Sequence, residues 1–340
     1  MNSTAGRSTR PSRSTPGLFD RESQPVWLLG LAFAATATAP AAAQYVLNDA
    51  LIEVRLPTSG WAPAPSPGTP VPAVSRSAGL LLGTPLPLGG STLSITINFD
   101  GGLTPSQEAV FSSARNTWEQ ALRGYQPGIS LAGPTITAKG VAIDGPGKVL
   151  GQAGPTVGWV ESGYLLTYEG EMKFDTDDLA WMETAGVLEE VILHEMAHVL
   201  GFGTLWNLTI NSTLYNDVRP VTGQYTGANA LNQYRLEFNQ PGATYVPVEL
   251  GGEGGTANSH WDEEDGGAAL TGITQVGTGN DMAFELMTGW LNSPTFLSQT
   301  TLESFRDIGF TPVPEPAAAA GAFALGIVGF ALWRRSSRSA

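Results

Sequence analysis

The pair of histidines in the stretch VILHEMAHVLGFGTLW constrains this chain more than any other feature of its sequence. His194 and His198 are four residues apart, so on a helix they share one face and their imidazoles can reach the same metal ion. The apolar residues around them predict a buried helix that begins near Thr184, and Gly201 suits a left-handed turn that ends it. Glu195 follows the first histidine, and His-Glu-x-x-His on a helix is a pattern in which the glutamate acts as general base beside zinc.

The zinc ion of a catalytic site usually has three protein ligands, and this stretch offers two. The chain contains three histidines and no cysteine. The third histidine, His260, is in ANSHWDEE, and neutral imidazole is the commonest protein ligand for zinc. We therefore predict that His260 completes the site. A carboxylate ligand stays open as an alternative, and the candidates are Asp217, Glu237, Asp262 and Glu263.

The rest of the body predicts an α+β protein. Alternating apolar and polar residues indicate strands over 91–100, 134–144 and 164–175. Thr104, followed by Pro105 and a glutamine, predicts a capped helix that runs to about Arg123. A last helix is expected over 302–310. The ordered domain should begin near residue 91, and the many glycines and prolines predict a loop-rich C-terminal part.

The N-terminal residues are predicted to be an export signal. Residues 1–43 combine an arginine-containing start, a short apolar stretch and a small-residue cleavage site after Ala43, as in a signal peptide. Residues 44–90 are rich in Pro, Ser and Gly and show little periodicity. We expect them to form a low-complexity extension or a pro-segment.

The C-terminal residues 313–340 form a second predicted signal. The sequence Val-Pro-Glu-Pro is followed by the apolar stretch 317–333 and then by arginines. An apolar stretch of this length is at the short limit for a membrane span, and the arginines place its end in the cytoplasm. The order of the three parts resembles a PEP-CTERM sorting signal. That resemblance implies a Gram-negative bacterium, transient anchoring in the inner membrane, and an exosortase-type enzyme that removes the tail from an extracellular or surface protein.

The charge of the chain argues against nucleic acid as a partner. The formal net charge is −14, and a body of this sign should not bind phosphate groups. Two acidic clusters, 175–178 and 262–265, could hold Ca²⁺, although neither matches a complete calcium-binding loop.

Several motifs taken in order resemble the leishmanolysin family of metzincin zinc peptidases. They are HEMAHVLGFGTLW, a long insert, SHWDEE, ELMTGWLN and TLESFRDIGF. In metzincins, a glycine three residues after the second histidine turns the chain toward a third histidine. Here Gly201 is present, but the position of the short metzincin spacing is Thr204, and the insert from Phe202 to Ser259 separates the motif from His260. The resemblance covers roughly residues 91–312.

The resemblance implies a zincin-type fold and a set of roles. His194, His198 and His260 would bind one catalytic Zn²⁺, Glu195 would be the general base, and Met287 would lie in a tight methionine turn. Residues 91–206 would form an N-terminal catalytic subdomain, and residues 207–312 would hold the insert, the third histidine and the methionine turn. The substrate would be a protein or peptide, paired with the strand before the helix, at about 164–174.

Two other functions stay open from the sequence. A gluzincin-type peptidase would use a carboxylate as third ligand, although residues 207–236 contain no glutamate. A surface or biofilm-matrix protein could keep zinc for stability alone, although such a protein has no need of a base at Glu195. Eukaryotic leishmanolysins use a cysteine for latency, and this chain has none, so any pro-segment must act through another group.

Overall fold

The computed structural model describes residues 42–47, 51–57, 92–252, 254–263, 267 and 269–313. All of them belong to one of the two units into which the chain divides, residues 40–340. Most of the predicted signal peptide and nearly all of the predicted C-terminal signal, including 317–333, lie outside the described residues. In the part of the chain that is described, no helix has the length and apolar character needed to cross a membrane.

A six-stranded mixed sheet forms the framework, which confirms the α+β class. Its strands are β1 (Ala43–Val46), β2 (Ile52–Arg55), β3 (Thr96–Phe99), β5 (Thr135–Val141), β6 (Val149–Glu161) and β7 (Tyr164–Asp175). The order is β1-β6-β7-β5-β3, and β2 also pairs with β6. β3, β5 and β7 are parallel, whereas β6 runs antiparallel to β7, β1 and β2. The three strands predicted from alternation are β3, β5 and β7.

The longest strand, β6, was missed, and its position corrects the predicted place of the substrate. Its sequence VLGQAGPTVGWVE contains three glycines and Pro155, and the register with β7 shifts beside that proline. Pro and Gly weaken a strand signal, and Pro is tolerated near the edge of a sheet. β7 is paired with β5 on one side and β6 on the other. The expectation that a substrate pairs with 164–174 is therefore wrong for residues 169–174, because both edges of β7 are paired there.

Two short strands correct the expected start of the ordered domain near residue 91. β1 and β2 come from the segment next to the predicted cleavage site and pair with β6. Each is four residues long, which is too short to give a clear alternation among neighbouring Pro, Ser and Gly. The extension 44–90 thus contributes strands to the main sheet.

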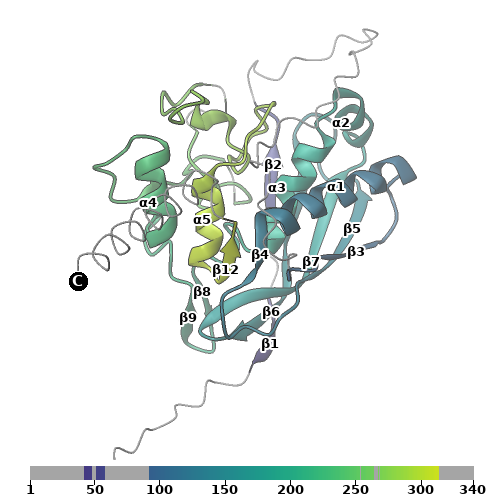
Figure 1. Ribbon diagram of the computed structural model, residues 1–340. Helices are drawn as coiled ribbons and strands as arrows, with labels where there is room; N and C mark the ends of the chain where they lie inside the picture. Colours follow the sequence, from purple (N-terminus) through teal and green to yellow (C-terminus); the bar gives the residue numbers. More distant parts are fainter. Residues whose placement is uncertain are drawn as a thin grey trace, which may run out of the picture. The chain divides into compact units, whose positions relative to one another are not determined.

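Two helices cover the central strands, as Figure 1 shows. α1 (Pro105–Ala121) has the predicted capping box at Thr104, and its buried face includes Ala114 and Trp118. α3 (Leu188–Leu200) carries the histidine motif and packs against α1, β6 and β7. Gly170 of β7 lets this helix approach, because a Cβ there would be 2.4 Å from Val199.

The helix predicted from Thr184 is in fact two helices. α2 (Leu179–Ala185) ends at Gly186, whose φ of +74° is left-handed, and α3 begins at Leu188. A left-handed residue cannot continue a right-handed helix, so the apolar pattern runs through a break. The predicted end at Gly201 is confirmed, with φ +117°.

The C-terminal part contains α4 (Ala228–Glu237), the short 3₁₀ helix η2 (Met282–Phe284) and α5 (Gln299–Asp307). The remaining described strands are two to four residues long and form three two-stranded sheets. The pairs are β4 (Leu122–Tyr125) with β12 (Phe310–Pro312), β8 (Leu208–Ile210) with β9 (Thr213–Tyr215), and β10 (Gln224–Tyr225) with β11 (Val246–Pro247). The predicted last helix begins three residues earlier and ends three residues earlier than expected.

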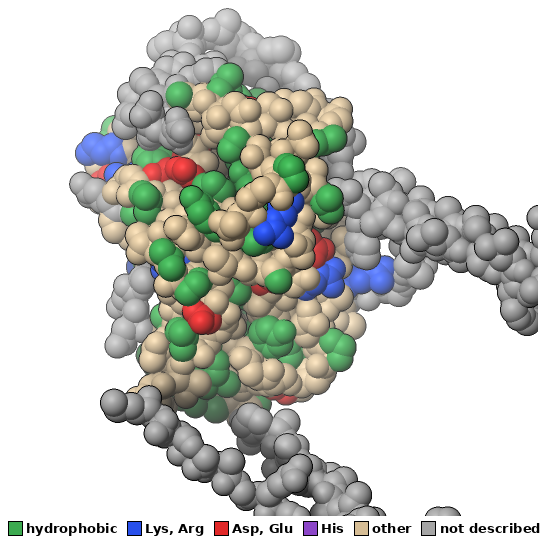
Figure 2. Space-filling model, turned by 90° about the vertical axis from the view of Figure 1, so that its left-hand side faces the viewer, with side chains coloured by type: hydrophobic (Ala, Val, Ile, Leu, Met, Phe, Trp, Pro, Cys, Tyr) green, Lys and Arg blue, Asp and Glu red, His purple; other side chains and the backbone are tan. Residues whose placement is uncertain are grey.

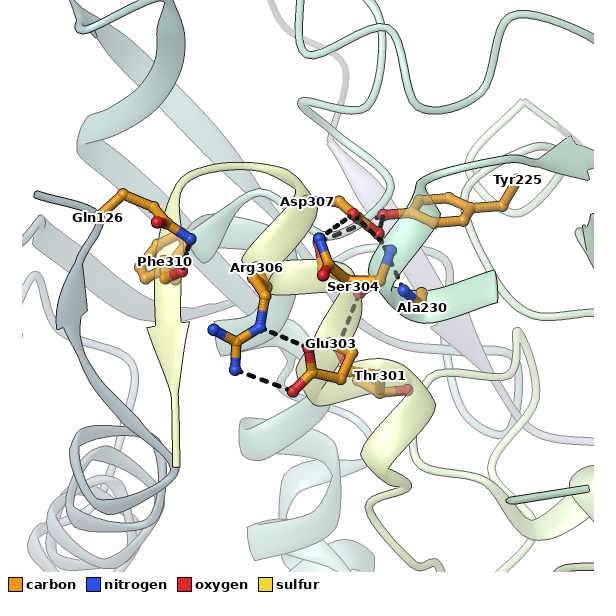
Figure 3. A network of polar contacts seen from close by, with 10 residues as sticks. Gln126, Tyr225, Ala230, Thr301, Glu303, Ser304, Arg306, Asp307 and Phe310 are labelled. Carbon is orange, nitrogen blue, oxygen red and sulfur yellow. Dashed lines mark hydrogen bonds and ion pairs between the residues drawn. The ribbon is translucent and has the colours of Figure 1, made fainter. Parts of the chain in front are cut away.

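Asp307 at the end of α5 ties this part together, as Figure 3 shows. Its carboxylate accepts hydrogen bonds from the backbone N–H groups of Asn229 and Ala230 at the start of α4, at 2.9 and 3.0 Å, and from the Tyr225 hydroxyl at 3.1 Å. A carboxylate in the first turn of a helix satisfies free amides and complements the helix dipole. Asp307 therefore joins the end of α5 to the start of α4.

Candidate metal centre

α3 holds two of the predicted ligands on one buried face. His194 is 2% exposed and His198 is 0% exposed, and their Nε2 atoms are 2.8 Å apart. The turn at Gly201 then directs the chain away from the helix end. The four-residue spacing of the two histidines thus places them on one face of the helix, as predicted.

His260 reaches the same point from a distant part of the chain. Its Nε2 atom is 3.1 Å from Nε2 of His194 and 3.0 Å from Nε2 of His198. The three side chains form the one group of His, Asp and Glu within the described residues that could hold a metal ion. Figure 2 shows a face on which no described histidine is visible, in agreement with the burial of all three.

Each imidazole is oriented by a hydrogen bond from its other ring nitrogen. Nδ1 of His194 lies 2.6 Å from the Leu286 carbonyl, Nδ1 of His198 2.9 Å from that of Phe202, and Nδ1 of His260 2.9 Å from that of Thr256. A carbonyl only accepts, so each Nδ1 must carry the proton. Each neutral ring then points an Nε2 lone pair at the other two.

Three converging lone pairs cannot hydrogen-bond one another, so the arrangement calls for a cation between them. Burial favours the neutral, ligating form: it lowers the pKa of His260 to about 4 and those of His194 and His198 well below the usual value. Zinc–nitrogen bonds of about 2.0–2.1 Å at tetrahedral angles separate the nitrogens by roughly 3.3–3.4 Å, a few tenths of an ångström more than here. The donor set and its spacing fit a metal ion, and they are compatible with zinc.

The carboxylates considered as third ligands lie outside this group. Glu237 accepts hydrogen bonds from the backbone amides of Gln299 and Thr300 at the start of α5, at 3.0 and 2.7 Å. Glu263 accepts one from Gly289 at 3.1 Å. Asp217 and Asp262 are also absent from the cluster. A three-histidine centre is thus the arrangement that the described residues offer.

Glu195 is a buried carboxylate beside the histidines. It is fully buried, and neither oxygen has a hydrogen-bond partner among the described residues. Burial raises its pKa well above the usual value, and the charge of Glu53 adds to this; the nearby backbone amide of Val54, which does not reach hydrogen-bond geometry, opposes it. Gly151 leaves room for the side chain, because a Cβ there would be 2.8 Å from Oε1 of Glu195. A buried carboxylate without partners can accept a proton from a reacting molecule.

Met287 lies in a tight turn, and a buried glutamate holds that turn. The Thr288 N–H donates to the Glu285 carbonyl at 3.3 Å. The Glu285 carboxylate accepts from the Met287 amide at 2.6 Å, and further hydrogen bonds come from Ser298 and Thr301. The preceding carbonyl, of Leu286, is the one that orients His194. Glu285 was not among the residues predicted from the sequence, and the signal for it is its position two residues before Met287.

In the first acidic cluster predicted to bind Ca²⁺, residues 175–178, Asp175 accepts hydrogen bonds from the backbone of a neighbouring loop. Oxygens of Asp175 accept backbone N–H groups from Ile143, Asp144 and Gly145 at 3.0–3.2 Å, and from Asp177 at 2.9 Å. The second cluster includes residues outside the described part of the chain. Calcium binding therefore stays a prediction.

The metal centre lies against a core of packed aromatic rings. Phe202 is in edge contact with Trp206 and Trp261, at ring-centroid distances of 4.7 and 5.0 Å. The ring of Phe202 also lies 6.1 Å from that of His198. These rings exclude water from one side of the histidines. No protein-family model matches this chain, and no curated protein matches it at a significant level.

Proposed function

We propose that this protein is a zinc-dependent endopeptidase with a zincin-type fold of the metzincin kind. The observation that carries the proposal is the convergence of three Nε2 atoms beside a fully buried Glu195 without hydrogen-bond partners. A purely structural zinc site has its four positions filled by the protein, whereas a catalytic site has three protein ligands and one open position. A turn containing Met287 and a helix end at Gly201 also accord with this class.

In this proposal each residue has a distinct role. His194, His198 and His260 would hold the ion through Nε2, with their rings fixed by the carbonyls of Leu286, Phe202 and Thr256. When bound, zinc would supply a positive charge that polarises a carbonyl and lowers the pKa of water.

Glu195 would act as the acid–base group. Its raised pKa suits a residue that first takes the proton of the attacking water and then delivers it to the leaving amide nitrogen. The absence of a side chain at Gly151 lets the carboxylate lie against the edge of β6 that pairs with β2. The chain thereby brings a base, a metal-binding face and a strand edge together.

We further infer from the two ends of the sequence that the protein is exported and that an exosortase-type enzyme processes its C-terminus. This inference rests on residues outside the described part of the chain. Mass spectrometry of the protein secreted by its host would test it, since both signals should be absent from the mature chain. Retention of either signal would contradict it.

The test of the proposed activity combines zinc content with hydrolysis of an unfolded protein. Glu195→Gln should retain one zinc per chain and lose hydrolysis, because the amide cannot accept a proton. His260→Ala should lose both. When both chains also carry Val54→Asp, which should release β2 from β6, equal hydrolysis with Glu195 and with Gln at this position would refute the proposed role of the base. Zinc binding without hydrolysis, also in the Val54→Asp chain described below, would favour a non-catalytic zinc protein.

A further inference from the structure

The short strand β2 has backbone partners along both of its edges. On one side it runs antiparallel to β6, in a register that pairs Val54 with Gly151. On the other side three hydrogen bonds connect it to two loops: Glu53 N–H to the Gly255 carbonyl at 2.9 Å, Arg55 N–H to the Gly289 carbonyl at 3.1 Å, and Leu291 N–H to the Arg55 carbonyl at 2.8 Å. An extended segment held in this way is bound as a peptide is bound by strand addition.

The loops that hold β2 are the same loops that orient the candidate zinc ligands. Gly255 precedes Thr256, whose carbonyl fixes His260, and Gly289 comes three residues after Leu286, whose carbonyl fixes His194. Figure 1 shows β2 alongside α3, the helix that carries His194, Glu195 and His198. We call the edge of β6 over 149–153, together with Gly255 and 289–291, the strand site. The strand site and the metal centre share one framework.

The register of β2 brings one particular peptide bond to the base. Val54 pairs with Gly151, and Gly151 is the residue whose missing Cβ makes room for Glu195. A general base that cleaves a peptide must hand a proton to the departing amide nitrogen. The backbone amide of Val54 faces the Glu195 carboxylate, so the bond presented there is the one between Glu53 and Val54.

Side chains as well as backbone fit β2 into the strand site. The Val54 side chain is buried, with 1% of the residue exposed. The Glu53 carboxylate accepts hydrogen bonds from Gln152 and Arg55, each at 2.7 Å, and its side chain lies over Gly255, where a Cβ would approach to 2.5 Å. The buried valine means that the strand site takes a small aliphatic side chain at the position after the presented bond.

We propose that the strand site is the substrate-binding site of this protein and that residues 51–57 of its own chain fill it, antiparallel to β6. The inference rests on the proposed peptidase function, and it adds the class of substrate and the means of latency. The substrate class is an extended peptide with a small aliphatic residue after the cleaved bond. Latency requires no cysteine, because the occupying strand is held by backbone hydrogen bonds and a buried valine. A tethered segment acts at an effective concentration that can reach the millimolar range, so it excludes a free peptide that binds more weakly.

The first arm of the test measures binding and needs no catalysis. In full chains that carry Glu195→Gln, Val54→Asp places a charge at a buried position and should release β2. Val46→Asp is the matched control, because Val46 is on β1, which also pairs with β6, but is 80% exposed. A fluorescent peptide with the sequence LIEVRLP, a copy of residues 51–57, should bind the Val54→Asp chain at least about tenfold more tightly than the control, equivalent to about 1.4 kcal/mol. Equal binding to both would overturn the proposal.

A second variant keeps the test decisive if Val54→Asp does not fold. Arg55→Pro removes the N–H that donates to Gly289 and introduces no buried charge. It should also increase peptide binding relative to Val46→Asp. A copy of the peptide in which its valine is replaced by aspartate should not bind either released chain. Binding of this altered peptide with the same affinity would show that the aliphatic position plays no part.

The second arm separates the failure of this inference from the failure of the proposed function. With Glu195 intact, the Val54→Asp chain should hydrolyse a peptide with valine after the cleaved bond at least about tenfold faster than the Val46→Asp chain. Equal hydrolysis by the two chains would refute self-occupation and leave the peptidase function standing. If the Val54→Asp chain binds the peptide more tightly than the control but hydrolyses none, the peptidase function is refuted and the assignment of the strand site stands.

Discussion

Gly151 of β6 and Glu195 of α3 lie so close that a Cβ on the glycine would stand 2.8 Å from Oε1 of the glutamate. The contact connects a strand edge to the proposed base. The position of the carboxylate therefore depends on the absence of a side chain on the strand that α3 packs against.

In a chain whose β2 is released by Val54→Asp, Gly151→Ala should reduce hydrolysis without removing the metal. The new methyl group would displace the Glu195 carboxylate, and a shift of about 1 Å at a catalytic group can cost on the order of 10²-fold in rate. Zinc content should stay at one per chain, since the three histidines are not touched. Gly242→Ala is the control, because a Cβ there meets no atom within 4 Å. A fully active Gly151→Ala enzyme would show that Glu195 does not act from this position.

His260→Ala and Glu263→Gln should separate the three-histidine centre from a carboxylate one. The first variant removes one of three converging Nε2 atoms, so zinc bound per chain should fall sharply on dialysis. The second changes a buried carboxylate that lies outside the cluster and should retain zinc. Atomic emission measurements of zinc decide between them. Loss of zinc in Glu263→Gln with retention in His260→Ala would reverse the assignment.

Removal of zinc should lower the thermal stability of the whole domain. The ligands come from α3 and from the loop before Trp261, so a bound ion connects two distant parts of the chain. A ligand present at 1,000 times its Kd stabilises a protein by about 4 kcal/mol if it binds only the folded state. Melting curves with zinc and with a chelator should therefore differ by several degrees. Superimposed curves would argue against an ion at the histidines.

Gly201→Ala and Gly186→Ala should both destabilise the protein, but the first alone should weaken zinc binding. Both glycines are left-handed, at φ +117° and +74°, and a side chain there costs about 1–2 kcal/mol. A Cβ on Gly201 would also approach Ile308 to 3.1 Å, whereas one on Gly186 meets nothing within 4 Å. Gly201 follows the helix that carries two ligands. Parallel melting and zinc titrations of the two variants test this difference.

The ion pairs of Glu171 should make part of the stability dependent on pH. Partial burial raises the pKa of this carboxyl, but Lys139 and Lys173 outweigh it, so the pKa is lowered. Its contribution is thus present above the pKa of the unfolded state, about 4.3, and is lost as the pH falls through the folded pKa. Glu171→Gln should lose about 0.5–1 kcal/mol at pH 7 and nothing once the carboxyl is protonated.

The control for this pH dependence is Glu169→Gln, which changes an exposed carboxylate on the same strand. Urea unfolding of both variants at neutral and at acid pH gives the comparison. A constant deficit for Glu171→Gln at every pH would mean that the glutamine changes packing and that the ion pairs contribute little.

Local features of the fold were predictable because their causes are local. Thr104 and its glutamine form the capping box that the sequence indicates, and Gly201 ends the histidine helix. Alternation located β7 because that strand is buried on a regular pleat. Gly186 shows the limit, since an apolar pattern that continues across a glycine does not say whether the helix continues too.

Long-range features were not predictable in the same way. Residues 52–55 join the sheet through partners on β6 and on loops near residues 255 and 289. A strand of four residues is too short for its alternation of apolar and polar residues to predict this pairing. β6 itself was hidden by its glycines and Pro155. The place of His260 beside the other histidines was expected because the chain offers no other histidine, whereas Glu285, which supports them, had no such argument.

The pairing of β2 with β6 also has a consequence for solubility. Release of β2 leaves the backbone amides and carbonyls of β6 over 149–153 as an open sheet edge, and such edges recruit strands from other molecules. The segment that closes the sheet therefore protects the protein against self-association until a substrate takes its place. A population of released chains should aggregate as their concentration rises, and a bound peptide should keep them monomeric.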